Sequence, residues 1–299
     1  MYPSKLAFTL LACASFQFSE GALSQEYKYA DVNGTRLAYI EAGAGDPAFL
    51  VHGGLQDLRF WKSHLDAFSK RYRAIAYSRR NHFPTDVSPD GTQDLAADVH
   101  GDDLAGLVEA LGLSKVHVVA HSSGAHSALF FATKHPALLR SLTVVEPPAA
   151  GILLGIDNGP SILKEFGERF APARDAFRKR DLENGLRLFA DAVGGPGTYE
   201  RRSEFDKKMM MDNVDSHIAD AISSRPRPQF TCAMAGAIKV PALLIRGGRS
   251  PEFFGAILTG LARCLPDAQV IVVQDASHTV PGENPEGFQA AVLPFLAKH

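Results

Sequence analysis

Short apolar runs of strand length alternate with stretches of helical periodicity along most of this chain. The apolar runs stand at 47–51, 74–77, 116–120, 142–145, 242–245 and 270–273. Residues 94–112, between two of these runs, place apolar side chains at helical spacing and predict an amphipathic helix. Apolar strands that alternate with helices are typical of a mostly parallel sheet covered on both faces. The pattern therefore predicts an α/β fold.

The N-terminal part of this region predicts a hairpin. Residues 26–30 and 36–41 have the pattern of two short strands, and Asn33-Gly34 between them is a strong turn signal. We expect the two strands to pair antiparallel at one edge of the sheet.

One long segment lacks strand patterns. From about residue 149 to residue 229 only helical segments occur, broken at 195–197 and 226–228, where Gly and Pro cluster. We predict that residues 149–229 are an all-helical insertion in a core made of residues 25–148 and 230–299.

Residues 1–24 have the pattern of an export signal. A positive charge precedes an apolar run at 6–16, and residues 22–24 are small enough for a signal peptidase site. The run is shorter than the roughly 20 apolar residues that span a bilayer, so we expect no membrane span. The alternatives are an unstructured apolar N-terminus and a lipid anchor at Cys13, because the residues before it resemble a weak bacterial lipobox. We predict a secreted or periplasmic protein whose mature form begins near Gln25.

Charge composition narrows the set of partners. The chain has 31 Lys and Arg against 33 Asp and Glu residues and a formal net charge of -2. This balance gives no electrostatic footprint for nucleic acid or for an anionic membrane. We therefore expect no nucleic-acid partner, and the sequence makes no prediction of oligomeric state.

Two of the three cysteines lie beyond the signal segment. Cys232 and Cys264 should stand on neighbouring helices around the strand at 242–245, so that they could pair in an oxidising compartment. Two unrelated buried thiols are the alternative. No Cys and His spacing suggests a metal site.

The strand at 116–120 leads into residues that can carry chemistry. It is followed by His-Ser-Ser-Gly at 121–124 and then by a helical stretch at 125–132. A buried strand that turns into a helix at a small-x-Ser-x-Gly sequence is typical of a nucleophile elbow, where a strained turn exposes the serine hydroxyl. Ser122 is therefore the candidate nucleophile, and the alternative is a serine that caps an ordinary helix.

Two further motifs flank this serine in the sequence. Upstream, the strand at 47–51 ends in His-Gly-Gly at 52–54, a loop that can direct a backbone N–H at a developing oxyanion. Downstream, the strand at 270–273 is followed by His278, which is a candidate base or else a solvated loop histidine. Because a serine hydroxyl is a poor nucleophile without a base and an oxyanion donor, these motifs strengthen the assignment of Ser122.

In this order, the loop at 52–54, Ser122 and His278 resemble the α/β-hydrolase fold family. The resemblance covers nearly all of the chain after the signal segment, although Ala120 stands where the family often has a glycine. It implies a mostly parallel central sheet flanked by helices, with residues 149–229 as a cap that closes the substrate site.

The resemblance also implies roles for individual residues. His278 would deprotonate Ser122, and the N–H groups of Gly54 and Ser123 would hold the oxyanion. No cofactor and no metal are implied. We also expect Gly53, Leu55, His121 and Met210 to contact the substrate.

Apolar side chains of the predicted cap have two interpretations. They either line a pocket for a medium-sized apolar group or pack the cap onto the core. These residues are Leu163, Phe166, Phe170, Phe177, Leu188, Phe189, Met209, Met210 and Met211.

The acid that would orient the histidine departs from the commonest family pattern. After the strand at 242–245 the family usually has an aspartate, and the corresponding residue here is Ser250. Haloalkane dehalogenases and zearalenone lactonases of similar fold instead have an acid after the strand that corresponds to 142–145, where this chain has Glu146. We predict Glu146 as the acid. Glu252 is the next candidate, and Glu146 could instead be a structural carboxylate at the hinge of the cap.

A second departure follows the strand at 74–77. Where the family often has Asp-x-x-Gly-x-Gly, this chain has Arg79 and Arg80. Either arginine could meet a substrate carboxylate at the mouth of the pocket, but we expect structural ion pairs with the acidic helix at 98–103.

Together these features predict a serine hydrolase. We expect it to cleave an ester or lactone of a small to medium, partly apolar molecule through an acyl-enzyme. A carbon–carbon bond hydrolase or a cofactor-free lyase can use the same serine. A non-catalytic ligand-binding relative is the alternative from another class of protein.

Overall fold

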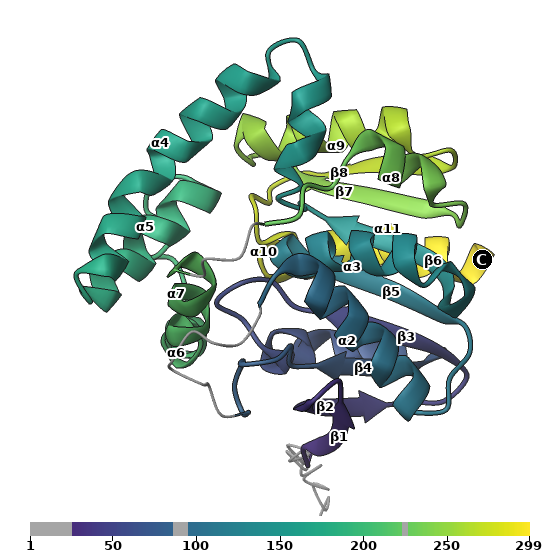
Figure 1. Ribbon diagram of the computed structural model, residues 1–299. Coiled ribbons are helices and arrows are strands. Elements are labelled where there is room, and N and C mark those ends of the chain that lie inside the picture. The colour runs from purple at the N-terminus through teal and green to yellow at the C-terminus, as the bar shows by residue number, and fades with distance from the viewer. Residues whose placement is uncertain (1–25, 86–94, 223–226) are drawn as a thin grey trace, which may run out of the picture.

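Eight strands form one sheet at the centre of the molecule (Figure 1). The computed structural model describes residues 26–85, 95–222 and 227–299, so the predicted signal segment and Cys13 lie outside the described residues. The spatial order of the strands is β1-β2-β4-β3-β5-β6-β7-β8. In chain order they are β1 (Lys28–Val32), β2 (Thr35–Ala42), β3 (Asp46–Val51), β4 (Tyr72–Tyr77), β5 (Val116–His121), β6 (Leu139–Val145), β7 (Ala242–Gly247) and β8 (Ala268–Val273).

The sheet has an antiparallel edge and a parallel centre. β1 pairs antiparallel with β2, and β2 pairs antiparallel with β4, whereas all pairs from β4 to β8 are parallel. The predicted hairpin is confirmed, because Val32 pairs with Thr35 around Asn33 and Gly34, which both have positive φ. Parallel neighbours bring their carboxyl ends to one edge of the sheet, which is where ligands bind in open α/β folds.

Helices cover both faces of the sheet. Side chains along a strand point alternately to opposite faces. In β5, Val118 and Ala120 belong to the hydrophobic layer under α2, α3 and α9, and Val119 belongs to the layer under α1 and α11. Within the described ranges, no helix combines the length and apolar character needed to cross a membrane. The helices of the core are α1 (Lys62–Ser69), α2 (Ala97–Ala110), α3 (Ser122–Lys134), α8 (Cys232–Ala237), α9 (Glu252–Cys264), α10 (Val280–Glu283) and α11 (Pro285–Lys298), with 3₁₀ turns η1 (Leu58–Trp61), η2 (Pro136–Leu138) and η3 (Ala150–Gly155).

Four helices inserted between β6 and β7 stand apart from the sheet (Figure 1). They have a hydrophobic cluster of their own, in which Phe177, Leu186 and Met210 pack with Leu55 of the core. No strand occurs between 149 and 229 in the part of the chain that is described. The inserted helices are α4 (Gly159–Arg178), α5 (Leu182–Gly194), α6 (Glu204–Asp212) and α7 (Val214–Ile222).

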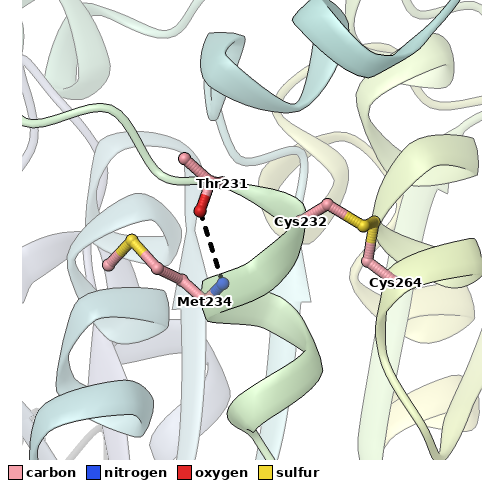
Figure 2. The surroundings of a disulfide bond; sticks show 4 residues. All are labelled: Thr231, Cys232, Met234 and Cys264. Atoms are coloured by element: carbon pink, nitrogen blue, oxygen red, sulfur yellow. Dashed lines mark hydrogen bonds between the residues drawn. A yellow bond between two sulfur atoms is a disulfide. The ribbon is translucent and has the colours of Figure 1, made fainter.

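A disulfide between Cys232 and Cys264 joins α8 to α9 (Figure 2). The two Cα atoms are 5.2 Å apart across a sequence separation of 32 residues. Next to the bridge, the hydroxyl of Thr231 accepts a hydrogen bond from the N–H of Met234 and caps α8. Of the two arrangements that the sequence left open, the structure shows the bridged pair.

Candidate active site

Ser122 occupies the sharp turn between β5 and α3. Its φ is 53°, a left-handed conformation that residues other than glycine rarely adopt. A Cβ atom on Gly124 would lie 2.2 Å from the carbonyl oxygen of His52, so glycine alone allows α3 to approach the end of β3 this closely. A strained serine and a tightly packed glycine are the features of a nucleophile elbow.

His278 and Glu146 reach Ser122 from the ends of two other strands. Nε2 of His278 lies 2.9 Å from Oγ of Ser122, and Nδ1 of His278 lies 2.9 Å from Oε2 of Glu146. Glu146 directly follows β6, and His278 stands in the loop after β8. The alternative acid, Glu252, begins α9, is exposed and forms no described hydrogen bond with His278. The structure therefore brings Ser122, His278 and Glu146 into one chain of hydrogen bonds.

Glu146 is held in a fully buried position. Its Oε1 accepts a hydrogen bond of 2.8 Å from the N–H of Gly247 at the end of β7. Burial raises the pKa of Glu146 to about 8, and the neighbouring Ser250 hydroxyl and the Gly247 N–H oppose this rise. Ser250, which stands where the family pattern usually has an aspartate, thus lies beside the carboxylate of Glu146. On the other side of the pair, the ring of Phe254 stacks on His278 at a centroid distance of 4.2 Å.

The protonation state of this pair decides whether Ser122 can be activated. Burial lowers the pKa of His278 to about 3, so the free imidazole is neutral at ordinary pH. A neutral imidazole has one N–H and one acceptor nitrogen. If Glu146 is ionised, it accepts the proton of Nδ1 and leaves Nε2 free to accept from Ser122. If Glu146 is protonated, it donates to Nδ1, and Nε2 carries a proton and cannot act as the base.

Two backbone N–H groups beside Ser122 have no acceptor among the described residues. They belong to Gly54, which follows β3, and to Ser123, the second residue of α3. Both residues line the cavity described below, and a Cβ atom on Gly54 would lie 3.5 Å from Oγ of Ser123. Free donors at a helix N-terminus and an adjacent loop can hold a developing oxyanion.

Arg79 holds the loop that carries Gly54 and the start of α3 by hydrogen bonds. Its Nη2 donates to the carbonyl oxygen of Gly53 at 3.0 Å and to Oγ of Ser123 at 3.1 Å, and its backbone N–H donates to Nε2 of His52 at 2.9 Å. These contacts place the Arg79 side chain under the candidate oxyanion loops, and its expected ion pair with the helix at 98–103 stays a prediction. Arg80 does form that pair, with Asp103.

A cavity of about 400 Å³ lies between the strand ends and the inserted helices. Leu55, His121 and Met210 line it, as predicted for substrate contacts, whereas Gly53 does not. The N–H of Gly53 donates to Oε1 of Gln56, and its carbonyl accepts from Arg79, so this residue supports the loop rather than facing the cavity.

The apolar residues of the inserted helices divide between the two interpretations. Phe166, Phe170, Phe189, Met209 and Met210 line the cavity. Phe177 is buried in the cluster between the inserted helices, Leu163 packs against the core, and Met211 is exposed. Some of these side chains therefore shape the cavity, and others only hold the helices together.

Several polar residues of the cavity wall carried no signal in the sequence. They come from segments far apart in the chain, and none belongs to a motif. Of the cavity histidines, His121 and His278 were expected, and Nε2 of His121 lies 2.9 Å from the carbonyl oxygen of His278, where it can hold the loop that carries the candidate base. The unpredicted residues are His82, His100, His126, Arg202 and Arg227.

Comparison with known proteins agrees with this fold and site. The model described as the alpha/beta hydrolase family matches residues 48–291, and the chain belongs to this family. It is thus a hydrolase by class.

Particular relatives differ in chemistry. An sn-1-specific diacylglycerol lipase of Mus musculus is 27% identical, with 99% of this chain and 94% of the lipase covered. A 2-(acetamidomethylene)succinate hydrolase of Mesorhizobium japonicum is 27% identical, with 89% and 93% covered. Among solved structures, a thermophilic esterase from Thermogutta terrifontis superposes with a TM-score of 0.70 at 25% identity, covering 91% of this chain and 98% of the esterase.

Proposed function

We propose that this protein cleaves a carboxylic ester or lactone through an acyl-enzyme on Ser122. The observation that carries the proposal is the continuous chain from Oγ of Ser122 through His278 to Glu146, with free N–H groups beside the serine. An ester is favoured over other acyl compounds because a lipase and an esterase are among the similar proteins.

The residues act in two half-reactions. Ser122 donates its proton to Nε2 of His278 as Oγ attacks the carbonyl carbon, and the N–H groups of Gly54 and Ser123 bind the resulting oxyanion. The carboxylate of Glu146 stabilises the imidazolium. The imidazolium then protonates the leaving alcohol, and the acyl group stays on Oγ. A water molecule, deprotonated by His278, attacks the acyl-enzyme and releases the acid and the free serine.

Active-site labelling tests the nucleophile directly. We expect a fluorophosphonate probe to label the wild-type protein covalently and to leave Ser122→Ala unlabelled, because the probe reacts with an activated serine. Ser127→Ala is the matched control, since the hydroxyl of Ser127 is bound to the carbonyl of Ser123 in the same helix. Equal labelling of Ser122→Ala and wild type would refute the assignment of Ser122.

Turnover distinguishes an ester hydrolase from its rivals. Steady hydrolysis of short carboxylic esters, lost in Ser122→Ala, is the expected result. A labelled serine that turns over no ester or lactone, but does cleave a carbon–carbon bond adjacent to a ketone, would assign the alternative chemistry. Absence of both labelling and turnover would leave the non-catalytic binding protein as the function.

We also propose that the protein is exported. Residues 1–24 have the pattern of a signal, and the Cys232–Cys264 disulfide supports the proposal because disulfides persist in oxidising compartments. Intact mass measured on protein exported from a bacterial host should give a chain that begins near Gln25. A chain that begins at lipidated Cys13 would show an anchored protein, and one that retains Met1 would contradict export.

A further inference from the structure

One cationic side chain of the cavity wall forms no ion pair with any residue that the structure describes. Arg202, between α5 and α6, lines the cavity together with Ser122 and His278. Its Nη2 donates to Oγ1 of Thr279, the residue after His278, at 3.0 Å. Among the described residues it forms no salt bridge, and its Nε is buried without a hydrogen-bond partner.

Two carboxylates, Asp206 and Glu283, offset this charge only in part, because neither forms a described salt bridge with Arg202. Burial lowers the pKa of Arg202, and the charges of Asp206 and Glu283 act on it only from a distance. Asp206 accepts the hydroxyl proton of Ser203, and Glu283 accepts from the N–H and hydroxyl of Ser277. A partly buried guanidinium that no carboxylate contacts is less favourable than a paired one. The site can therefore still accept a negatively charged group.

Basic residues outnumber acidic ones in the described wall of the cavity. Of the described charged residues that line the cavity, Arg79, Arg202 and Arg227 are basic and Asp206 is acidic. Burial lowers the pKa of His278, and the charge of Arg202 lowers it further, so this guanidinium opposes the imidazolium that ester cleavage requires. An anion bound to Arg202 would remove that opposition.

We propose that Arg202 binds a carboxylate of the substrate, so that the preferred ester carries a negative charge within a few bonds of its scissile carbonyl. This inference rests on the proposed ester hydrolysis and specifies its substrate class. A guanidinium has five N–H donors, and the structure engages one of them, on Thr279. Donors are left for the two parallel hydrogen bonds that arginine makes to a carboxylate.

The test compares one ester with its neutral isostere. Ethyl hydrogen succinate carries a carboxylate where ethyl 4-methylpentanoate carries an isopropyl group of similar shape. Acid release from both esters can be followed by titration at constant pH. We expect wild type to have the larger kcat/KM for the anionic ester. In Arg202→Gln, the ratio of kcat/KM between the anionic and the neutral ester should fall by about 10- to 100-fold, the range for charge-assisted hydrogen bonds.

Two variants control for loss of structure. Arg201→Gln removes the adjacent arginine, which bonds to Pro196 and Thr198 on the surface, and should leave the ratio at its wild-type value. Arg202→Lys keeps the charge with fewer donors and should give an intermediate ratio. If Arg202→Gln slows both esters equally, the arginine only holds the loop at Thr279 and the proposal is overturned.

A binding measurement tests for the carboxylate subsite at Arg202 independently of ester turnover. Titration calorimetry of Ser122→Ala with ethyl hydrogen succinate should show binding that is at least tenfold weaker when Arg202→Gln is added. Equal affinity in the two backgrounds would reject the carboxylate subsite. If wild type cleaves neither ester but this difference in affinity is found, the proposed hydrolysis fails and the anion site stands.

Discussion

The parallel strands and the inserted helices hold their residues by different means. All six residues of β5 are buried, and the strand is paired along both sides, with β3 and with β6. On α4, by contrast, pairs such as Lys164 with Glu168 and Arg178 with Asp175 are mostly exposed, and such pairs contribute little to stability. The chemistry that we propose rests on the ends of buried strands, and the choice of substrate rests on helices whose charged faces are open to solvent.

Besides the apolar packing of Leu55 with the inserted helices, a few polar contacts join the two regions. Nδ2 of Asn213, between α6 and α7, donates to Oδ2 of Asp57 at 2.7 Å, and Oδ1 of Asn213 accepts from the N–H of Phe83 at 2.9 Å. Arg59 pairs with both Asp57 and Asp212. Because the proposed catalytic residues stand on the strand ends and the contacts hold the inserted helices, we expect changes at the strand ends to alter kcat. Changes at these contacts should alter substrate binding and stability.

The largest effect is expected on the strand side, from Glu146→Gln. This change removes the charge that stabilises the imidazolium while it keeps the shape of the side chain. We expect kcat for a short ester to fall by about 10²- to 10⁴-fold, with folding retained.

Two further variants calibrate this result. Glu252→Gln is the matched control and should leave kcat near the wild-type value, because Glu252 is exposed at the start of α9. Ser250→Asp in the Glu146→Gln background tests whether a carboxylate at the neighbouring position can restore part of the rate. Near-normal turnover in Glu146→Gln alone would refute Glu146 as the acid.

The next largest effect is expected on the dependence of kcat/KM on pH. Because burial raises the pKa of Glu146 to about 8, the active state with an ionised carboxylate forms as pH rises through about 8. We expect kcat/KM to increase up to tenfold per pH unit below that value and to level off above it. Glu146→Gln should abolish this limb. A rate that is flat from pH 6 to pH 9 in wild type would contradict the assignment.

Stability should change with pH in the opposite sense. The folded state keeps the proton of Glu146 between the ordinary pKa of 4.5 and about 8, whereas the unfolded chain loses it. The contribution of this group to the free energy of unfolding therefore falls as pH rises across that window. Urea unfolding at several pH values should show a smaller decline in Glu146→Gln than in wild type.

Removal of the disulfide should separate stability from catalysis. Cys232 and Cys264 join two helices of the core, and neither cysteine lines the cavity. Replacing both with serine should lower the free energy of unfolding by about 2–4 kcal/mol and leave kcat within about twofold of wild type. Thermal and urea unfolding, with and without a reductant, measure this. An unchanged melting temperature would show that the bridge does not stabilise the fold.

The smallest effect is expected at the contact between the two regions. Asn213→Ala removes the acceptor of the Phe83 N–H and a donor to the buried carboxylate of Asp57, and should cost about 1–3 kcal/mol in unfolding free energy. We expect KM to rise several-fold while kcat changes less, since the strand ends are untouched. Asn184→Ala, which removes an exposed amide from α5, is the control. A loss confined to kcat would contradict the division between the two regions.

The sequence by itself determined the order of the core elements and the positions of Ser122, His278 and Glu146 at strand ends. These features are readable because each depends on local patterns, namely apolar runs, a small-x-Ser-x-Gly turn and a carboxylate directly after a strand. Their meeting within hydrogen-bond distance matches the prediction, and their catalytic roles stay predictions. Strand limits were less readable: β6 begins at Leu139, three residues before the apolar run.

Only the tertiary structure decided features that depend on segments distant in the chain. Val270 and Val272 belong to an apolar run, yet they are half-exposed because β8 is the last strand of the sheet. Arg79 turns under the candidate oxyanion loops, and Arg202 enters the cavity wall, because the packing of other elements sets where each side chain can go. Periodicity assigns a residue to an element and a face, but the neighbours that meet that face are brought there by the fold.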